Sequence, residues 1–247
     1  MYTVGITGTN GKSSTTAWIA AALARIATPV ARTTTLGSFL DEKRLDLPLN
    51  YMGFVETMRR CLAAGGRYAA VELTSEALAR GFAKAWPCAS AVFTNLTHDH
   101  LDSHGSPEHY LASKAQLFLQ LPPSGVAILN GCDPASELLA EVVPSGVRIV
   151  RYGVATRGQA LAPLDLAARS VSLSWTGTSI ELDAAGDYRG DLPQWIRVRS
   201  VGDVFAENAL AAFATVVALG VAPNQAADAL SSAEPLPGRF EGVGISS

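Results

Sequence analysis

A short stretch near the start of the chain carries residues whose types and spacing suit phosphate binding. Residues 7–14 read Thr-Gly-Thr-Asn-Gly-Lys-Ser-Ser and follow an apolar run, residues 2–6, that is typical of a strand. Glycines let backbone N–H groups point at an anion, the N-terminus of a following helix favours negative charge, and Lys12 adds a mobile positive charge. Ser13 would place a hydroxyl on a phosphate-bound Mg²⁺. The stretch therefore predicts a nucleotide phosphate loop.

The loop departs from the strict phosphate-loop pattern at one position. That pattern requires glycine where the chain has Ile6, and Gly5 and Gly8 lie on either side of it. The alternative interpretation is a glycine-rich turn followed by a serine that caps a helix. A strand before the loop and Lys-Ser at an expected helix start favour phosphate binding.

The histidines form a second candidate group, because all four lie between His98 and His109. One interpretation is a transition-metal site built from imidazoles and carboxylates. Another is a Mg²⁺ site beside the nucleotide that uses one histidine and nearby carboxylates, and the third is a set of unrelated surface histidines. A zinc site has little support, since the group contains no cysteine and no HExxH spacing.

Two further charged side chains lie at informative positions. Glu72 ends an otherwise apolar run, residues 68–73, where an unpaired carboxylate would be costly, so we expect a cation or a metal partner. The alternative is a solvated glutamate at a strand end. Lys114 lies in an expected helix after the histidines, and helical periodicity alone predicts that it is solvated.

The pattern of elements predicts how these residues are brought together. Up to about residue 155, short apolar runs alternate with longer helical segments, which indicates βαβ units and a doubly wound, mostly parallel α/β sheet. Ligands of such sheets bind at the carboxyl ends of the strands. Beyond that point, residues 171–175 and 179–182 alternate around a Thr-Gly-Thr turn and predict a hairpin, with residues 195–198 as a third strand. We therefore expect a small antiparallel region near residues 165–200.

The individual elements follow from the same patterns. Residues 36–50 read as a polar, irregular connection. The expected strands are residues 2–6, 30–35, 68–73, 89–95, 125–130 and 147–152. The expected helices are residues 13–27, 51–64, 76–80, 107–120, 134–142, 204–219 and 222–232.

Composition excludes several classes of protein. The 247 residues are 48% hydrophobic and 17% charged, which is enough to bury a sizeable core. A net charge of −3 without a basic stripe argues against nucleic acid as the main partner. Cys61, Cys88 and Cys132 are far apart and predict reduced, buried thiols. Neither a signal peptide nor a clean membrane span is evident, so we expect a cytoplasmic protein with no membrane partner.

Several separated motifs, taken together, resemble the Mur ligase family. They are residues 7–13, 71–75, 94–105, 110–118, 205–212 and 237–241. The similarity is greatest to the members that add the third amino acid to UDP-N-acetylmuramoyl-L-alanyl-D-glutamate. It implies an ATP-dependent carboxylate–amine ligase of peptidoglycan (cell wall) biosynthesis, in which the acceptor carboxylate becomes an acyl phosphate that an amine then attacks.

The resemblance also implies roles for individual residues. The phosphates of ATP would be bound by the loop residues Gly8, Thr9, Asn10, Gly11, Lys12, Ser13 and Ser14. Asn208 would contact the adenine and Arg239 the nucleotide. Magnesium would be held by Ser13, Glu72, His100 and Lys114, the last of these as a carbamylated lysine. Lys12, His100 and Lys114 would form the catalytic set, in which cations offset the charge of two reacting anions.

The half of the site that would bind the acceptor departs from the family pattern. Residues 47–51 replace a Thr-Thr-Pro stretch, and Thr74 and Glu76 stand where the family has serine and histidine. Phe82 replaces an arginine that meets the substrate in the family, which removes a bidentate anion clamp. We therefore expect the acceptor to be either a UDP-sugar peptide or another small-molecule carboxylate.

The resemblance covers only the central ATPase domain of the family. Residues 1–247 are expected to form this single domain, with a β-rich subregion at about 160–201 and a helical end at 203–232. Family chains also carry an N-terminal domain for the uridine nucleotide and a C-terminal domain for the amine. We therefore expect weak or no ligation from this domain alone, and a separate C-terminal-type domain or partner protein. The alternatives are a nucleotide-binding module without ligase activity and a metal-dependent hydrolase that uses the histidines.

Overall fold

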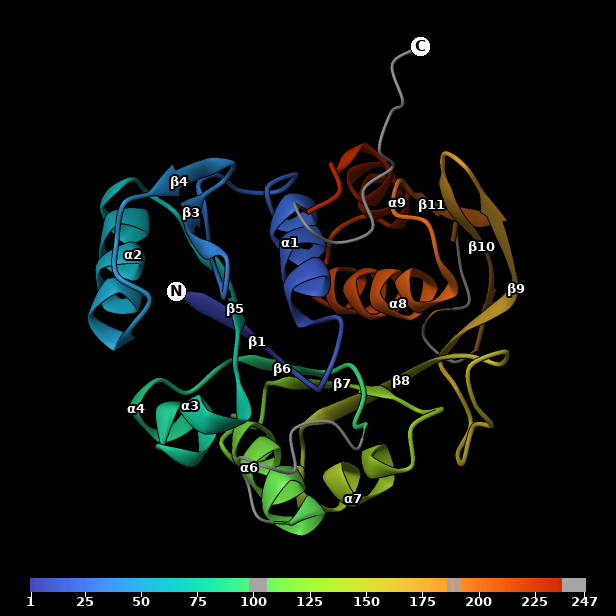
Figure 1. Cartoon of the computed structure of the whole chain (residues 1–247), viewed down its shortest axis with the longest axis horizontal. Coiled ribbons are helices and arrows are strands. Elements are labelled where there is room, and N and C mark those ends of the chain that lie inside the picture. Colours follow the sequence, from blue (N-terminus) through green and yellow to red (C-terminus); the bar gives the residue numbers. More distant parts are fainter. Residues whose placement is uncertain (98–105, 186–187, 189–191, 237–247) are drawn as a thin grey trace.

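The computed structural model describes residues 1–97, 106–185, 188 and 192–236, and its strands form one sheet (Figure 1). The strand order is β11-β10-β9-β8-β7-β6-β1-β5-β2-β3-β4. The parallel strands are β1 (Tyr2–Thr7), β2 (Val30–Thr34), β5 (Tyr68–Glu72), β6 (Ser90–Phe93), β7 (Val126–Asn130), β8 (Arg148–Val154) and β9 (Leu166–Ser174). Antiparallel strands flank them at both edges: β3 (Gly37–Leu40), β4 (Lys43–Leu45), β10 (Gly177–Ala184) and β11 (Trp195–Val198).

Helices pack on both faces of the sheet, and each face has its own hydrophobic cluster. One face carries α1 (Lys12–Leu23), α8 (Asp203–Ala218) and α9 (Pro223–Ser232). The other carries α2 (Tyr51–Ala63), α3 (Ser75–Ala79), α4 (Phe82–Ala85), α6 (Pro107–Leu119) and α7 (Ala135–Val142). The doubly wound, mostly parallel fold and the antiparallel region near residues 165–200 are thus confirmed.

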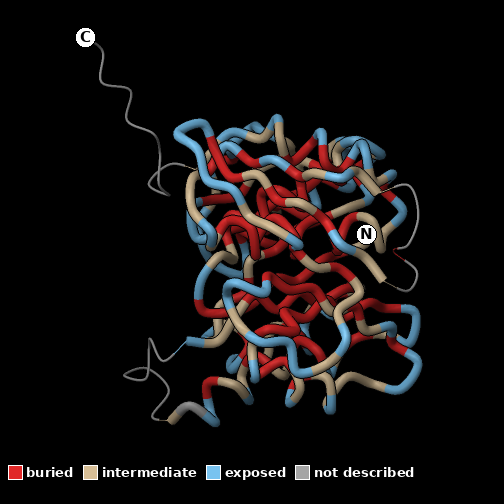
Figure 2. The backbone as a smooth tube through the Cα atoms, turned by 90° about the vertical axis from the view of Figure 1, so that its right-hand side faces the viewer, coloured by how far each residue is buried: buried red, intermediate tan, exposed pale blue. Residues whose placement is uncertain are grey.

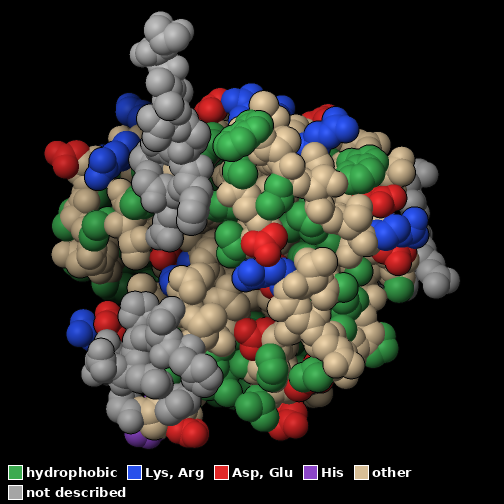
Figure 3. Space-filling model, turned by 45° about the vertical axis from the view of Figure 1, so that its right-hand side comes forward, with side chains coloured by type: hydrophobic (Ala, Val, Ile, Leu, Met, Phe, Trp, Pro, Cys, Tyr) green, Lys and Arg blue, Asp and Glu red, His purple; other side chains and the backbone are tan. Residues whose placement is uncertain are grey.

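The two helices nearest the middle of the first face are buried on almost every side. Ten of the twelve residues of α1 are buried, and α8 is buried without interruption from Phe205 to Val216. A helix that lies between a sheet and other helices must be apolar all round, which explains the alanine-rich sequences of both. Figure 2 shows the buried residues of the chain gathered in the interior, with exposed residues on the outer turns. Acidic and basic side chains lie interspersed over the face drawn in Figure 3.

The central strand β1 places its side chains alternately on the two faces. Val4 and Ile6 join the cluster beneath α1, whereas Gly5 points to the other face. A Cβ at Gly5 would lie 2.8 Å from a methyl of Leu117 and 2.9 Å from Cys88 Sγ. Glycine therefore allows α6 to approach the sheet closely, and this approach positions Lys114, one turn earlier on the same helix.

One expectation about the connections is wrong. Residues 36–50 are not an irregular connection throughout, because β3 and β4 lie within them and extend the sheet beyond β2. Asp41, at a left-handed φ of 50°, makes the turn between these strands. Its carboxylate accepts a hydrogen bond of 2.8 Å from the Val30 N–H, which fixes the turn against the start of β2. The remaining expected elements lie within a few residues of the observed ones.

Candidate functional site

The predicted phosphate loop joins β1 to α1 and depends on two glycines with positive φ. Gly8 has φ 147° and Gly11 has φ 83°, conformations that other residues adopt only with strain. A Cβ at Gly8 would overlap the Thr94 hydroxyl, and one at Gly11 would overlap the Asn208 amide oxygen. Both glycines are therefore required by close neighbours as well as by the backbone.

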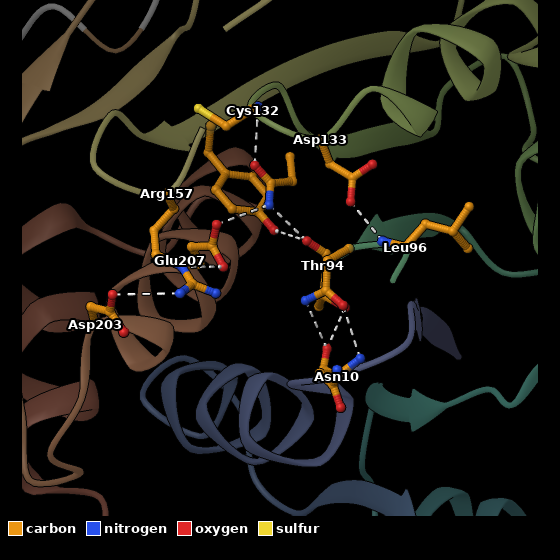
Figure 4. Close-up of polar contacts among 11 residues, drawn as sticks. Asn10, Thr94, Leu96, Cys132, Asp133, Arg157, Asp203 and Glu207 are labelled. Atoms are coloured by element: carbon orange, nitrogen blue, oxygen red, sulfur yellow. Dashed lines mark hydrogen bonds and ion pairs between the residues drawn. The ribbon is translucent and has the colours of Figure 1, made fainter. Parts of the chain in front are cut away.

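The end of β6 fixes the shape of this loop. Thr94 Oγ1 donates to the Asn10 carbonyl at 2.7 Å (Figure 4). The Thr9 N–H donates to the Asn95 carbonyl at 2.8 Å. The Asn10 N–H donates to Asn95 Oδ1 at 2.9 Å. Asn95 Nδ2 also donates to the Asn10 carbonyl, at 3.2 Å. Four hydrogen bonds that define the loop thus involve Thr94 and Asn95, the two residues that follow β6. No role was predicted for Thr94 or Asn95 individually, although both lie in the motif at residues 94–105 and at the end of an expected strand.

The first turn of α1 follows the loop directly and contains Lys12, Ser13 and Ser14. Lys12 Nζ donates to the Thr9 carbonyl at 2.8 Å, so its charge is folded back over the loop. Ser13 and Ser14 are buried. The helix has no acidic residue in its own first turn, so no carboxylate of α1 offsets the partial positive charge of its N-terminal N–H groups.

Glu72 ends β5 beside this turn, paired in register with Ile6 of β1. Its Oε2 accepts hydrogen bonds from Ser13 Oγ at 2.8 Å and from the Thr35 N–H at 3.2 Å. Within the described part of the chain its partners are thus hydroxyl and amide donors rather than a cation. A hydroxyl and a carboxylate oxygen this close are hard ligands of the kind Mg²⁺ prefers, so the pair fits a magnesium ion.

Lys114 lies inside the protein, and the prediction of a solvated lysine is wrong. The residue is 1% exposed, and its Nζ donates to the Gly8 carbonyl at 2.9 Å. The same ammonium lies 4.0 Å from the centre of the Tyr110 ring. Loss of solvation, together with repulsion from Lys12, lowers the pKa of Lys114 to about 7. Helical periodicity missed this because the close approach of α6 to β1 buries the residue.

Asn208, on α8, lies against the opposite side of the loop. Its side chain is buried, and its Oδ1 accepts no hydrogen bond from the described residues. A buried amide oxygen without a donor costs free energy unless a ligand or water supplies one. The exocyclic amino group of adenine is such a donor, so this orphaned oxygen fits the expected nucleotide. Arg239 and His100, which were expected near the same ligand, lie outside the described residues.

Behind the loop, a buried polar network supports the end of β6 (Figure 4). Asn130 Nδ2 donates to the Thr94 carbonyl at 2.8 Å, and Asp133 Oδ2 accepts from the Leu96 N–H at 2.6 Å. Glu207 lies 3.4 Å from Arg157, and burial raises the pKa of its carboxyl. None of these residues was assigned a role from the sequence. Their signal was weak, because Asn130 ends β7 whereas Asp133, Arg157 and Glu207 lie beyond the strands.

A cavity of about 630 Å³ opens next to Glu72, at the carboxyl ends of β2 and β5. Thr33, Thr34 and Thr35 line its inner end together with Glu72. Its outer wall is formed by the aromatic side chains of Tyr51, Phe54 and Phe82. Glu72 therefore faces both the phosphate loop and a space large enough for a small molecule.

Only one of the four histidines of the expected site lies in the described part of the chain. His98, His100 and His104 lie outside the described residues, and His109 is exposed in the first turn of α6. Among the described residues, no group of three or more histidine, cysteine, aspartate or glutamate side chains is arranged to hold a metal ion.

Comparison with known proteins identifies the family. A model described as the Mur ligase middle domain matches residues 6–216. The chain belongs to this family. Mur ligases are ATP-dependent enzymes that form amide bonds in peptidoglycan synthesis, so the resemblance based on the separated motifs is confirmed.

Individual relatives agree with this assignment. The UDP-N-acetylmuramoyl-L-alanyl-D-glutamate--2,6-diaminopimelate ligase of Xylella fastidiosa (strain 9a5c) is 34% identical over 249 residues, covering 99% of this chain and 48% of that protein. A solved structure of an enzyme with the same name has a TM-score of 0.83 at 24% identity, covering 97% of this chain and 47% of that one. The Acinetobacter baumannii UDP-N-acetylmuramoylalanyl-D-glutamyl-2,6-diaminopimelate--D-alanyl-D-alanyl ligase has a TM-score of 0.76 at 22% identity, covering 98% and 48%.

The match has a limited extent. The chain spans about half the length of the curated relatives it matches. Among its described helices, none combines the length and the apolar character needed to cross a lipid bilayer.

Proposed function

We propose that residues 1–247 form a single domain that binds ATP and activates a carboxylate in a Mur-type amide ligase. The observation that carries this proposal is the position of Glu72. Its carboxylate accepts a hydrogen bond from Ser13, beside the phosphate loop, and also lines the neighbouring cavity. A phosphate donor and a carboxylate acceptor bound on the two sides of Glu72 would meet there.

The charges around the loop support phosphoryl transfer between two anions. Lys12 and the N-terminus of α1 would hold the β- and γ-phosphates, and Asn208 would accept from the adenine amino group. Ser13 and Glu72 would hold Mg²⁺, which would offset negative charge where the two substrates meet. Roles for His100 as a further magnesium ligand and for Arg239 on the nucleotide rest on the family resemblance alone.

Lys114 would take part in a modified form. A lysine with a pKa of about 7 is largely neutral at slightly alkaline pH, and a neutral amine reacts with CO₂ to give a carbamate. The product would place a negative group next to the loop and could bind a second Mg²⁺. In the unmodified protein, Lys114 Nζ instead donates to the Gly8 carbonyl.

The remaining partners follow from the family and from the length of the match. A small-molecule carboxylate, which is a UDP-sugar peptide in the named relatives, would be the acceptor, and an amino acid or another amine would be the second substrate. The amine would need a further domain or a partner protein. Buried thiols at Cys61, Cys88 and Cys132 and a requirement for ATP fit a cytoplasmic location.

A second candidate is a nucleotide-binding module that does not ligate. It is favoured by the changes on the acceptor side of the site, where Phe82 and Glu76 replace the arginine and histidine of the resembling ligases. The two functions share the same ATP site and differ in whether an acceptor triggers turnover.

Nucleotide binding is the first test. Fluorescent ATP should bind in the presence of Mg²⁺, and Lys12→Ala should weaken it at least tenfold, whereas Lys84→Ala, an exposed lysine on α4, should leave it unchanged. Glu72→Gln should reduce the dependence of binding on Mg²⁺, because the charge that attracts the ion is lost. Equal affinities for the wild-type chain and the Lys12 variant would refute the proposed phosphate site.

Turnover is the second test. Carboxylates are added to the chain with MgATP and hydroxylamine, which converts an acyl phosphate into a stable hydroxamate. Acceptor-dependent hydroxamate and phosphate in equal amounts would support carboxylate activation. Tight nucleotide binding without product, with or without a C-terminal Mur ligase domain added in trans, would support the binding module.

A further inference from the structure

The cavity beside Glu72 has an aromatic outer wall whose side chains hold one another in place. We call Tyr51, Phe54 and Phe82 the aromatic wall. The rings of Phe54 and Phe82 meet edge to face with centroids 5.0 Å apart, and Tyr51 and Phe82 meet at 6.0 Å. Trp86 supports the wall from behind, 5.0 Å from Phe54. Such edge-to-face contacts fix ring positions, so the wall is a preformed surface.

The cavity lining includes a hydroxyl-rich group and an apolar group. Thr33, Thr34, Thr35 and Ser38 line it together with Glu72, which lies beside the phosphate loop. Pro48 and Leu49, which precede Tyr51 in the chain, line it together with the aromatic wall. Leu49 is 64% exposed and Met52, one residue beyond Tyr51, is 70% exposed, so the apolar surface continues outside the cavity. An exposed apolar side chain in the lining, such as Leu49, favours an apolar ligand.

Charge in the cavity disfavours a second anionic group on the acceptor. Among the described residues that line it, the charged ones are Glu72, Glu76 and Arg80. With Glu72 assigned to Mg²⁺, Glu76 and Arg80 offset each other, so this described lining offers no surplus positive charge to a second carboxylate. Arg80 is exposed. By the family resemblance, Phe82 stands where an arginine would meet the substrate. A dicarboxylate bound with one carboxylate at Glu72 and Mg²⁺ would place its other carboxylate among apolar side chains, at a high desolvation cost.

We propose that the acceptor is a carboxylate joined to an uncharged aromatic or branched aliphatic group, which packs against the aromatic wall. The carboxylate would lie at the threonine-lined end of the cavity, near Glu72, and the apolar group would cover Phe82. This inference rests on the proposed ligase function and narrows its substrate class. It predicts that the dipeptide of UDP-N-acetylmuramoyl-L-alanyl-D-glutamate, with its free second carboxylate, binds poorly.

The test compares matched probes on the intact chain by calorimetry. N-benzoyl-D-alanine, N-acetyl-D-glutamate and the UDP-sugar dipeptide are each titrated in the presence of Mg²⁺ and a non-hydrolysable ATP analogue. The benzoyl compound should bind at least tenfold more tightly than either dicarboxylate. Phe82→Leu should keep this order, because it keeps an apolar surface, whereas Phe82→Arg should reverse it by at least tenfold.

Each outcome decides the inference. Each variant that binds fluorescent ATP is shown to be folded. If the wild-type chain does not bind fluorescent ATP, the result counts against the proposed ATP-binding function and not against the proposed acceptor class. If the nucleotide binds but the benzoyl probe does not, the inference is wrong. It is also wrong if a dicarboxylate binds more tightly and loses affinity in Arg80→Ala, because Arg80 would then be the anion clamp.

Discussion

Burial of Lys114 should make the free energy of unfolding depend on pH in a way that one substitution removes. The pKa of this lysine falls from 10.5 in the unfolded chain to about 7 in the folded one, first because of desolvation and then because of Lys12. Between these values the unfolded state holds one more proton, so stability increases with pH. Below pH 7 the folded state carries the full penalty of a buried charge, and above pH 10.5 the penalty is gone.

The size of the effect follows from the same values. At pH 7 the penalty is roughly 4 kcal/mol, and at pH 9 it is roughly 2 kcal/mol. Lys114→Met removes it but also removes the hydrogen bond to the Gly8 carbonyl and the contact with Tyr110, which together contribute about 2–4 kcal/mol. At pH 7 the two effects nearly cancel or leave the variant slightly more stable. Its advantage over the wild type should then fall by about 2 kcal/mol between pH 7 and 9.

The assay is urea denaturation of both proteins from pH 7 to 9 in CO₂-free buffer, since carbamylation would change the charge of Lys114. Burial raises the pKa of Cys61, Cys88 and Cys132, which lowers stability as pH increases, but these thiols act equally in both proteins. Lys84→Met, at an exposed position, should give a curve parallel to that of the wild type. Parallel curves for Lys114→Met would refute the claim that its pKa is depressed.

Three other substitutions test neighbouring contacts, each by urea denaturation. Gly11→Ala should lower the free energy of unfolding by at least about 2 kcal/mol, because the new Cβ overlaps Asn208 and the backbone is left-handed. Gly65→Ala is the matched control, with φ 85° and no described atom within 4 Å of the new Cβ. It should lower the free energy of unfolding by only about 1 kcal/mol. Asn208→Ala should keep its stability while ATP affinity drops about tenfold, since it removes a buried acceptor that lacks a protein donor; an unchanged affinity would contradict this. Arg157→Ala should cost about 2 kcal/mol by leaving Glu207 buried without its ion pair, and Glu207→Gln in the same background should restore part of the loss.

The sequence predicted the parts of the site that depend on strand ends. Parallel strands bring their carboxyl ends to one edge, so the phosphate loop after β1 and the acidic residue at the end of β5 were expected at the same edge of the sheet. The strand order, which the sequence did not predict, makes them neighbours, since β1 pairs with β5 and Ile6 lies opposite Glu72. These positions could be predicted because strand direction and element order are encoded locally.

The sequence could not predict features that depend on contacts between distant segments. Lys114 is buried because Gly5 admits α6 close to β1, and nothing within the helix itself reports this. The β3–β4 hairpin was missed because its strands are short and end at an exposed edge, where apolar alternation is weak. The support of Thr94 by Asn130 joins residues 36 positions apart.

The shared position of Glu72 has a thermodynamic consequence for the two ligands. One oxygen of this carboxylate accepts from Ser13 on the nucleotide side and from Thr35 on the cavity side, so neither ligand can bind without altering the field felt by the other. Linkage requires that each ligand change the affinity of the other by the same factor, typically 5- to 150-fold for coupling of about 1–3 kcal/mol. Acceptor affinities measured without nucleotide would therefore describe a different site from the one that turns over, and screens for the acceptor should be carried out with the nucleotide bound.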